Sequence, residues 1–411
     1  MKIVIINHSF QKSFFRNRWE QFAKSHKDVD IYLITPKEFK WGESKALTFG
    51  VTEKIVASNI ENNNFHVITI KSKKTIIPGW KSTEFKRVLK TIKPDFIYHI
   101  GTHTQNPIFQ LINLKKRMFK KTILISFSMR GTNTTLKSRI ELIKYEKNLI
   151  KKILRFPLYI LDCFRLKKFN KYVDCVVCHY PDAKDLFVKE GFQKKISVQT
   201  QVGVDTSVFA PNDTFRNDIR KKYSISDGTF VFGSASRFHY SKGILQILDA
   251  LNFDGDWKYL LIGSGTDEEV QTINKKIIEN HLSDRVIMTG YVPVEEMPMY
   301  WNALDCAIHF PISTPKWIET FSLALVQAMA TKLPVIGSSS GSVPYQVGEK
   351  GLIIEEGNSS KLSLMMQKIM RDKEFSSTNA NNMFARARQF FSVTSLNEQF
   401  YNLLLELIDQ K

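Results

Sequence analysis

The sequence lacks any uninterrupted apolar run of about 18 residues, the length that crosses a bilayer as a helix, so no spanning segment is expected. Residues 1–7 also lack the long apolar segment and the small-residue cleavage site of a secretory signal. Their apolar pattern predicts a first β-strand instead. We therefore expect a protein without a leader or a membrane anchor of its own.

Cysteine is scarce, with only four among 411 residues. Cys175 and Cys178 have CxxC spacing, but they lie in an apolar run that predicts a strand, where positions three apart point to opposite faces. No second pair completes a zinc site. We therefore expect buried structural cysteines and a reducing, cytoplasmic compartment.

Several catalytic motifs are also missing. The sequence contains no HExxH zinc motif, no Walker A loop and no GxGxxG dinucleotide fingerprint. Two D-x-D patterns occur, at Asp28 to Asp30 and at Asp254 to Asp256, and this pattern holds metal ions in some enzymes. The first lies at the entry to a strand and the second in a turn that Asp and Gly favour, so we expect structural roles. The sequence predicts neither a metal nor a cofactor.

Acidic residues are scarce in the first half of the chain. Residues 1–205 hold 39 Lys and Arg but only 17 Asp and Glu, a net charge of +22, whereas residues 206–411 carry −3. Within the first half, residues 115–171 hold 17 basic and 3 acidic side chains. This imbalance predicts a polyanionic partner for the first half, such as anionic lipid, a phosphate-bearing acceptor or nucleic acid.

The basic segment allows two interpretations. Residues 134–172 are expected to be helical, basic and amphipathic in patches, with Pro157 preventing one uniform helix. They form either a contact with an anionic membrane surface or a solvated helix face over an ordinary core. The charge of the whole half favours the membrane. Nucleic acid is disfavoured because no aromatic stacking platform or recognised binding motif accompanies the charge.

Strands and helices alternate along both halves, which predicts α/β domains with doubly wound parallel sheets. In the first half we expect helices at residues 14–26, 85–92 and 183–189 and strands at 3–7, 29–34, 66–70, 95–100, 122–126 and 173–178.

The most informative stretch is residues 317–334, because it links two short apolar strands through one helix. The helix is expected at about residues 321–330, with Thr320 as its N-cap. Glu319 then lies at the carboxyl end of a parallel strand, where α/β sheets bind ligands. The backbone N–H groups of Phe321, Ser322 and Leu323 would point at a bound anion.

Other predicted strand ends supply further polar groups. Arg237 follows one strand, and Lys242 precedes the next helix. Gly263 and Gly265 form a turn after a second strand, and residues 291–292, Tyr and Val, follow a third. Two cations at the same sheet edge as Glu319 would stabilise an anionic group.

These segments resemble the group 1 (family 4) retaining glycosyltransferases, which have the GT-B fold, and the resemblance covers residues 203–364. It implies that Glu319 faces the donor sugar and that Arg237 and Lys242 hold the diphosphate. Gln327 occupies the position of a second family Glu that holds the ribose. The backbone of Tyr291 and Val292 lies where the family holds the base, and Gly263 and Gly265 match the family's Gly-x-Gly.

The first half resembles the family less. Gly203 begins a hinge sequence that matches the family pattern, but the loop after the first strand has no glycine pair. His103 is a candidate for the cleft, although a turn histidine is more often solvated or a capping residue. The resemblance implies two Rossmann-like domains facing each other across a cleft. Their expected bounds are 1–205 for the acceptor and 206–392 for the nucleotide-sugar, with a helix at 393–411 packing back on the first domain.

The sequence therefore predicts a cytoplasmic enzyme, peripheral on the inner face of the plasma membrane. It would transfer a sugar with retention from a nucleotide-diphosphate sugar to a saccharide acceptor. The resemblance implies that this acceptor is lipid-linked and belongs to bacterial surface polysaccharide synthesis, such as lipopolysaccharide or capsule. The alternatives are an impaired sugar-nucleotide or glycan-binding protein, motivated by Gln327 and the missing glycine loop, and another GT-B enzyme such as a nucleotide-sugar epimerase.

Overall fold

The computed structural model describes residues 1–41, 53–56, 58–74, 80–101, 106–128, 140, 144, 149–315 and 317–410. The chain divides into two compact units. Among the described residues, the first unit comprises those up to Gln201 and those from Asn397 onward, and the second unit is Val202–Leu396. The first unit therefore ends at residue 201 and resumes at residue 397, whereas the sequence predicted these boundaries at residues 205 and 393.

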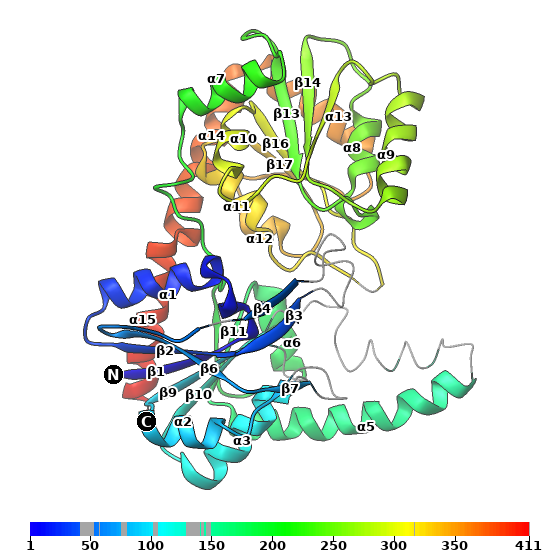
Figure 1. Ribbon diagram of the computed structural model, residues 1–411. Helices are drawn as coiled ribbons and strands as arrows, with labels where there is room; N and C mark the ends of the chain where they lie inside the picture. The colour runs from blue at the N-terminus through cyan, green and yellow to red at the C-terminus, as the bar shows by residue number, and fades with distance from the viewer. Residues whose placement is uncertain are drawn as a thin grey trace. The chain divides into compact units, whose positions relative to one another are not determined.

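The first unit is built on an eight-stranded sheet of order β12-β11-β10-β9-β1-β2-β6-β5 (Figure 1). All neighbours are parallel except β5 and β6. From β1 the chain winds outward to β6 and then returns through β9 to β12, which is a doubly wound topology. The strands are β1 (Lys2–Ile6), β2 (Asp30–Pro36), β5 (Ile60–Asn62), β6 (Phe65–Ile70), β9 (Phe96–Ile100), β10 (Ile123–Ser128), β11 (Cys175–Cys178) and β12 (Lys195–Val198).

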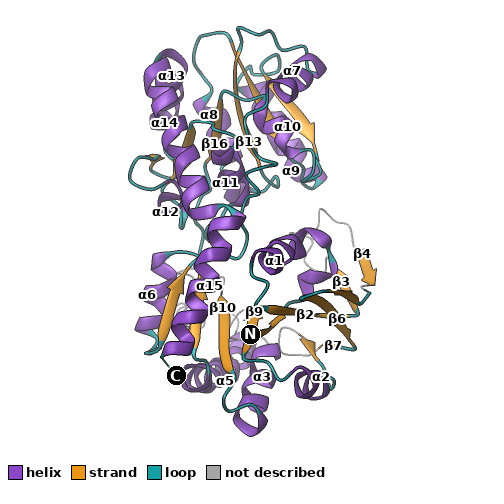
Figure 2. Cartoon of the chain, turned by 90° about the vertical axis from the view of Figure 1, so that its left-hand side faces the viewer, coloured by secondary structure: helices purple, strands orange, loops and turns teal. Residues whose placement is uncertain are grey.

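Helices cover both faces of this sheet (Figure 2). They are η1 (His8–Gln11), α1 (Ser13–Ser25), α2 (Phe85–Ile92), α3 (Asn106–Met118), α5 (Leu149–Tyr172), α6 (Pro181–Lys189) and α15 (Val393–Asp409). One hydrophobic cluster joins Ile3 and Ile5 of β1 to Trp19 of α1 and to Phe400 and Leu404 of α15. The C-terminal helix is therefore part of the core of the first unit.

Three features of the first unit depart from the predicted pattern. Two small antiparallel pairs were not predicted, β3 (Glu38–Trp41) with β4 (Glu53–Val56) and β7 (Lys73–Lys74) with β8 (Trp80–Lys81). The antiparallel edge strand β5 was also not predicted. The expectation that Pro157 breaks the helix is wrong, because α5 runs through it. Pro157 is exposed, so water can hydrate the carbonyl that its missing N–H leaves unbonded.

The second unit has a fully parallel six-stranded sheet of order β15-β14-β13-β16-β17-β18. This is the strand order 3-2-1-4-5-6 of dinucleotide-binding folds. The strands are β13 (Phe230–Ala235), β14 (Trp257–Ile262), β15 (Val286–Gly290), β16 (Cys306–His309), β17 (Val335–Ser338) and β18 (Leu352–Ile354). The predicted pair of Rossmann-like domains is thus confirmed.

Alternating side chains of the second sheet enter two hydrophobic clusters, as the period of a strand requires. Val231 and Leu260 face one cluster, and Phe232 and Tyr259 face the other. The helices are α7 (Asp213–Lys222), η3 (Tyr240–Lys242), α8 (Ile244–Ala250), α9 (Asp267–Glu279), α10 (Met297–Asn302), α11 (Leu323–Ala330), α12 (Val343–Val347), α13 (Ser359–Arg371), α14 (Lys373–Arg386) and the π-helix η4 (Ala387–Phe391). With both faces covered, the carboxyl ends of the strands remain as the place for a ligand.

Candidate functional site

The order in which strands are added to the second sheet reverses at β13 and β16, which are parallel neighbours at its centre (Figure 1). Loops that leave adjacent strands in opposite directions open a crevice at this point, and ligands bind there in open α/β sheets. Lys242 follows β13 and Glu319 follows β16. Lys242 Nζ lies 2.7 Å from Glu319 Oε2, so the switch point brings together two of the predicted site residues.

The backbone of Glu319 is fixed from the loop after β17. Its carbonyl accepts a hydrogen bond of 2.8 Å from the N–H of Ser342. Gly341 has a φ of +51°, and a Cβ there would lie 2.0 Å from the same carbonyl oxygen. Only glycine therefore allows this close approach. The Glu319 residue is 5% exposed, so its carboxylate is both held and largely removed from water.

His309, the last residue of β16, is the second neighbour of the Glu319 carboxylate. Its Nε2 lies 3.5 Å from Glu319 Oε2, the outer limit of a hydrogen bond. No shorter partner for this nitrogen is found among the described residues. Burial lowers the pKa of His309, although Glu319 opposes this effect. The ring is then neutral at pH 7, and its proton lies on Nε2 if it donates to the carboxylate.

The Glu319 carboxylate is strongly acidic despite its burial. Burial alone would raise its pKa, but the hydrogen bond with His309 and the charge of Lys242 outweigh this effect. The pKa falls from 4.5 to about 2. Glu319 is therefore ionised at neutral pH. Its Oε2 faces Lys242 and His309, whereas Oε1 makes no hydrogen bond to the residues that the structure describes.

Lys242 is held on two sides. Besides Glu319, its ammonium lies 4.4 Å from the centroid of the Trp317 ring, a cation–π contact. Arg237, two residues after β13, is half-buried, and its guanidinium makes no hydrogen bond or ion pair within the described part of the chain. Burial lowers the pKa of His239, Glu269 opposes this, and the charges of Arg237 and Lys242 lower it further. Both cations therefore act on the same short loop.

The loop after β14 packs tightly against the loop that carries Arg237. A Cβ at Gly263, whose φ is +135°, would lie 1.9 Å from the carbonyl oxygen of Ser236. At Gly265 a Cβ would lie 2.6 Å from Cβ of Phe238. These glycines therefore allow the loop after β14 to pack closely against the loop that carries Arg237. After β15, Tyr291 is 61% exposed and Val292 is buried.

The predicted start of α11 needs correction. Its N-cap is Ser322 and not Thr320, because the Ser322 hydroxyl accepts from the N–H of Leu325 and the helix begins at Leu323. The side-chain amide of Gln346 holds Ser322 in an extended conformation: its oxygen accepts from the Ser322 N–H and its nitrogen donates to the Ser322 carbonyl, both at 2.9 Å. The N–H of Ser322 is thus already bonded and is not free for an anion. Phe321 and Leu323, the two other predicted donors, flank it and are half-buried.

Gln327 lies in the second turn of α11 and is buried. Its Oε1 accepts a hydrogen bond of 3.3 Å from Nε1–H of Trp301, a residue of α10. Since an indole N–H only donates, the amide oxygen must face it. The amide nitrogen of Gln327 makes no hydrogen bond to the described residues. A donor group, and not an acceptor, is therefore left for a ligand at this position.

Two other predicted site residues lie away from this cluster or outside the described residues. Gly203 packs against the segment that leaves η4, where a Cβ would lie 2.8 Å from Cδ1 of Leu396 and 3.1 Å from the carbonyl oxygen of Phe391. Close packing thus accounts for this glycine. His103 lies outside the described residues.

Three residues that build the site were not predicted from the sequence: His309, Trp317 and Gln346. His309 had a detectable signal, because a histidine ending the apolar strand 306–309 lies at the ligand edge of a parallel sheet. Trp317 lies two residues before Glu319, which suggests that it belongs to the site. The sequence does not indicate that its ring contacts Lys242. Gln346 acts from a helix 24 residues beyond Ser322, and no local pattern reveals such a pairing.

The cysteines and the aspartate pairs have structural surroundings. Cys175 and Cys178 are buried in β11, and burial raises the pKa of the Cys178 thiol to about 12. Asp28 accepts from the hydroxyl of Tyr401, and Asp256 from that of Thr229. The described residues contain no group of three His, Cys, Asp or Glu placed to hold a metal ion.

Helix α5 forms part of the basic segment 134–172, for which the sequence predicts a membrane contact. Phe156, Ile160 and Phe164 recur every four residues and therefore share one face. They are 56%, 41% and 66% exposed. Lys167 and Lys171 are exposed on the next turns. Among the helices that the structure describes, none has the length and apolar character to cross a bilayer.

Comparison with known proteins finds a family model that matches part of this chain. Residues 215–389, which include every residue of the cluster around Glu319, match the model "Glycosyl transferases group 1". An N-acetyl-alpha-D-glucosaminyl L-malate synthase from Bacillus anthracis is 27% identical over 202 residues, 48% of this chain and 48% of its own. An O-antigen chain mannosyltransferase B from Escherichia coli is 26% identical over 150 residues, 36% of this chain and 38% of its own. The matches thus span about half or less of these relatives.

Solved structures extend the similarity of fold to the whole chain. HepE from Anabaena, solved in complex with UDP, superimposes with a TM-score of 0.69 at 18% identity. The match covers 99% of this chain and 100% of that protein. At this identity the likeness shows the fold, which is that of the GT-B enzymes.

Proposed function

Because residues 215–389 match the model of the group 1 glycosyltransferases, we propose that this chain transfers a sugar from a nucleotide-diphosphate sugar to a saccharide acceptor with retention of configuration. The observation that carries the proposal is the ionised Glu319, held by Lys242 at the topological switch point of the second sheet. A fixed carboxylate beside a cation suits a substrate with sugar hydroxyls next to a diphosphate.

Arg237 and Lys242 would bind the diphosphate. During transfer, the bond between the anomeric carbon and the phosphate oxygen breaks, and negative charge accumulates on the leaving group. Fixed cations stabilise this charge in the transition state. Arg237 has no carboxylate partner among the described residues, so it would meet the phosphate without first breaking an ion pair. In this proposal the two side chains supply the charge stabilisation, and no cofactor is required.

Glu319 would position the sugar. Its Oε1 has no hydrogen bond among the described residues and would accept from one or two sugar hydroxyls. The acceptor hydroxyl would attack on the face that the nucleotide leaves, and its proton would pass to the departing phosphate oxygen. The new glycosidic bond then has the configuration of the donor, and no separate catalytic base is needed.

Gln327 would meet the ribose. Its oxygen is occupied by Trp301, so its amide nitrogen would donate to a ribose oxygen. The backbone after β15, at Tyr291 and Val292, would contact the base. HepE from Anabaena, which shares this fold, was solved with UDP, and this supports a nucleoside diphosphate as the leaving group.

The acceptor would be a lipid-linked saccharide at the inner face of the plasma membrane, in the synthesis of a surface polysaccharide. Support comes from the excess of basic residues in the first unit and from the exposed apolar side chains of α5. The Escherichia coli relative is an O-antigen chain mannosyltransferase, which is consistent with such a pathway. The Bacillus anthracis relative carries malate in its name, so relatives at this distance differ in acceptor.

A mass-spectrometric screen of nucleotide-sugars, first for binding and then for turnover with saccharide acceptors, tests the proposal. We expect one nucleotide-sugar to bind and to release its nucleoside diphosphate when an acceptor is added. Anomeric analysis of the product by NMR then checks retention. Binding without any release under all acceptors would contradict the enzyme and favour a binding protein. Conversion of the donor without acceptor would favour an epimerase.

A further inference from the structure

A groove of about 450 Å³ lies on the first unit between α3 and α5, within the size range of small-molecule sites (roughly 300–1,000 Å³). Three of its lining residues are cations, Lys81, Arg165 and Lys168, and no Asp or Glu is among the described residues that line it. Asp162, the only acidic residue in the sequence of α5, is not part of the lining. The groove therefore has a net positive lining.

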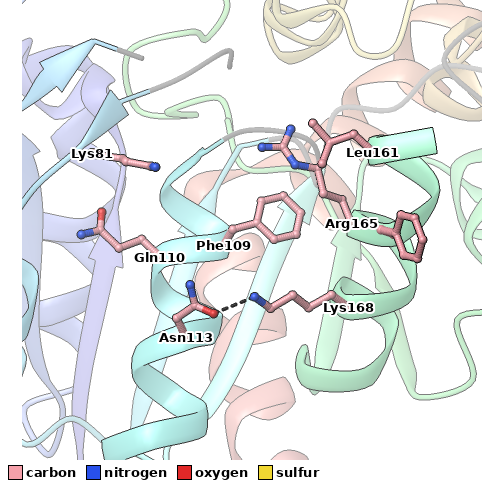
Figure 3. Close-up of a pocket in the computed structure, with 8 residues that line it drawn as sticks. Lys81, Phe109, Gln110, Asn113, Leu161, Arg165 and Lys168 are labelled. Carbon is pink, nitrogen blue, oxygen red and sulfur yellow. Dashed lines mark hydrogen bonds between the residues drawn. The ribbon is translucent and has the colours of Figure 1, made fainter. Parts of the chain in front are cut away.

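Two amides order the polar part of this groove. Lys168 Nζ donates a hydrogen bond of 2.6 Å to Asn113 Oδ1 of α3 (Figure 3). Gln110 bonds both the N–H and the carbonyl of Ser82, which fixes the strand that carries Lys81. The lining is thus a built arrangement from three elements and not a set of unconnected surface lysines.

The other part of the groove is apolar. The guanidinium of Arg165 lies 5.0 Å from the centroid of the Phe109 ring, which packs at the floor (Figure 3). Leu161 and Phe164 of α5 line the rim and are 39% and 66% exposed. Phe164 also ends the exposed apolar row that runs from Phe156 through Ile160. The groove therefore opens beside a surface that water solvates poorly.

We propose that this groove binds the phosphodiester headgroup of a single anionic phospholipid, with its acyl chains lying against Leu161 and Phe164. Arg165, Lys168 and Lys81 would contact the phosphate, and the amide of Asn113 would remain the second partner of Lys168. Arginine and lysine bind phosphate through charge-assisted hydrogen bonds, which are stronger than neutral ones. The site rests on the proposed attachment to anionic membrane, but it adds a defined location and a one-to-one stoichiometry.

Monomeric short-chain phosphatidylglycerol is the probe, because a single dispersed lipid cannot report attraction to a charged surface. We expect saturable binding at a ratio of one lipid per chain. Lys168→Gln and Arg165→Gln should each weaken it by about tenfold or more, the effect of losing a hydrogen bond between charged groups. Phe164→Ser should also weaken it, since the acyl chains lose their apolar contact.

Matched variants on the same helix control for charge and apolar area. Lys167→Gln is the control for Lys168→Gln, because it removes one positive charge at the preceding position. Phe156→Ser is the control for Phe164→Ser, because it removes a phenyl ring two turns earlier. Neither Lys167 nor Phe156 lines the groove. Both should change binding by less than about twofold if the site is specific. An equal loss in Lys167→Gln and Lys168→Gln, or the absence of saturable binding, would overturn the proposal.

Two further measurements separate the possible ligands and the possible failures. Glycerol phosphate has the phosphate without the chains, and binding as tight as that of the lipid would overturn the assignment to a lipid. In every variant, nucleotide release is also measured with a soluble saccharide acceptor, and its rate should stay unchanged. Loss of that reaction in Lys168→Gln would overturn the separation of this groove from the transferase site.

Discussion

The two units share a doubly wound parallel sheet but differ in where their chemistry lies. In the second unit, the ionisable side chains of the candidate site converge on one point, where Lys242 and His309 hold a single carboxylate. In the first unit, cations are spread along α5, which also has an exposed apolar face. One fold therefore carries two kinds of electrostatics: a preorganised pair in a buried crevice and a diffuse field on a surface.

This difference has physical consequences that can be measured. A buried charge pair acts at short range and is screened little by salt, whereas exposed charges are screened beyond about 10 Å at moderate ionic strength. Salt should therefore separate the two units. We expect membrane attachment to weaken with salt and binding of the donor diphosphate to change less.

The largest effect should follow from removing a cation of the second unit that we propose binds the diphosphate. Arg237→Ala should lower turnover by about 100-fold or more, the scale of deleting one group that stabilises developing charge. Arg237 is half-buried and makes no ion pair among the described residues, so the fold should be retained. Steady-state kinetics checks this, with Lys275→Ala as a control because Lys275 is 79% exposed on α9. Normal turnover in Arg237→Ala would refute the diphosphate assignment.

Loss of the central carboxylate should have a similar effect. Glu319→Ala removes the group that would hold the donor sugar, and it also leaves Lys242 and His309 without their shared partner. We expect most turnover to be lost. Thermal unfolding must be measured in parallel, since the alanine also opens a space in a buried site. A variant that unfolds normally and turns over normally would contradict the proposed role.

Reversing two lysine charges in each unit tests whether binding to anionic vesicles depends on the first unit. Lys167→Glu with Lys171→Glu should weaken binding to anionic vesicles by roughly 2 kcal/mol or more, about 30-fold, because each lysine near such a surface contributes about 1 kcal/mol. Both residues are exposed on α5. The matched pair in the second unit is Lys221→Glu with Lys275→Glu, which should have little effect.

Sedimentation with anionic and with neutral vesicles measures this binding. The parent chain should sediment with the anionic vesicles, and added salt should reduce the recovery. Equal recovery on both kinds of vesicle at low salt would contradict an electrostatic attachment. Equal losses in the two charge-reversed pairs would show that total charge, and not the first unit, is responsible.

The buried pair also predicts a pH dependence of stability. The pKa of Glu319 falls from 4.5 to about 2 on folding, so its ionised form stabilises the fold above about pH 4.5. This contribution is lost as the pH falls from about 4.5 toward 2. The lowered pKa of His309 acts in the same direction, because the fold disfavours its protonation. Acid should therefore destabilise the parent chain.

Urea unfolding at a series of pH values checks this expectation. The free energy of unfolding of the parent should fall more between about pH 5 and about pH 3 than that of Glu319→Gln. The glutamine has nearly the same shape but does not titrate. Parallel curves for the two proteins would mean that Glu319 is not held in its ionised form.

The sequence predicted the sheets well because buried parallel strands are short apolar runs with clear boundaries. It placed Glu319, Arg237 and Lys242 near the ends of such runs, and the family resemblance supplied the roles expected of them. It placed the N-cap of α11 at Thr320 because both Thr320 and Ser322 are good caps, and the choice depends on Gln346, which lies far along the chain. The strands of the pairs β3–β4 and β7–β8 are only two to four residues long, too short for a pattern to stand out, and were missed for that reason.

The smallest effect should come from Gln327. Its amide oxygen is bonded to Trp301, and its nitrogen would donate to the ribose. In Gln327→Glu, one carboxylate oxygen can accept from Trp301 while the other accepts from a ribose hydroxyl. Hydrogen bonds to charged groups are stronger, so the donor should bind equally well or more tightly, by about 1 kcal/mol or several-fold in affinity.

This gain should appear in donor binding and not in the chemical step, because the ribose is remote from the bond that breaks. A fall in donor KM with unchanged kcat is the expected result, and calorimetric titration of the nucleotide gives an independent value. Gln327→Leu is the matched control, since it keeps the volume but removes both hydrogen bonds, and it should weaken donor binding. If Gln327→Glu abolishes binding while Glu319→Ala is silent, the motif from Glu319 to Gln327 has been assigned in the wrong register, and the ribose must be held by other residues.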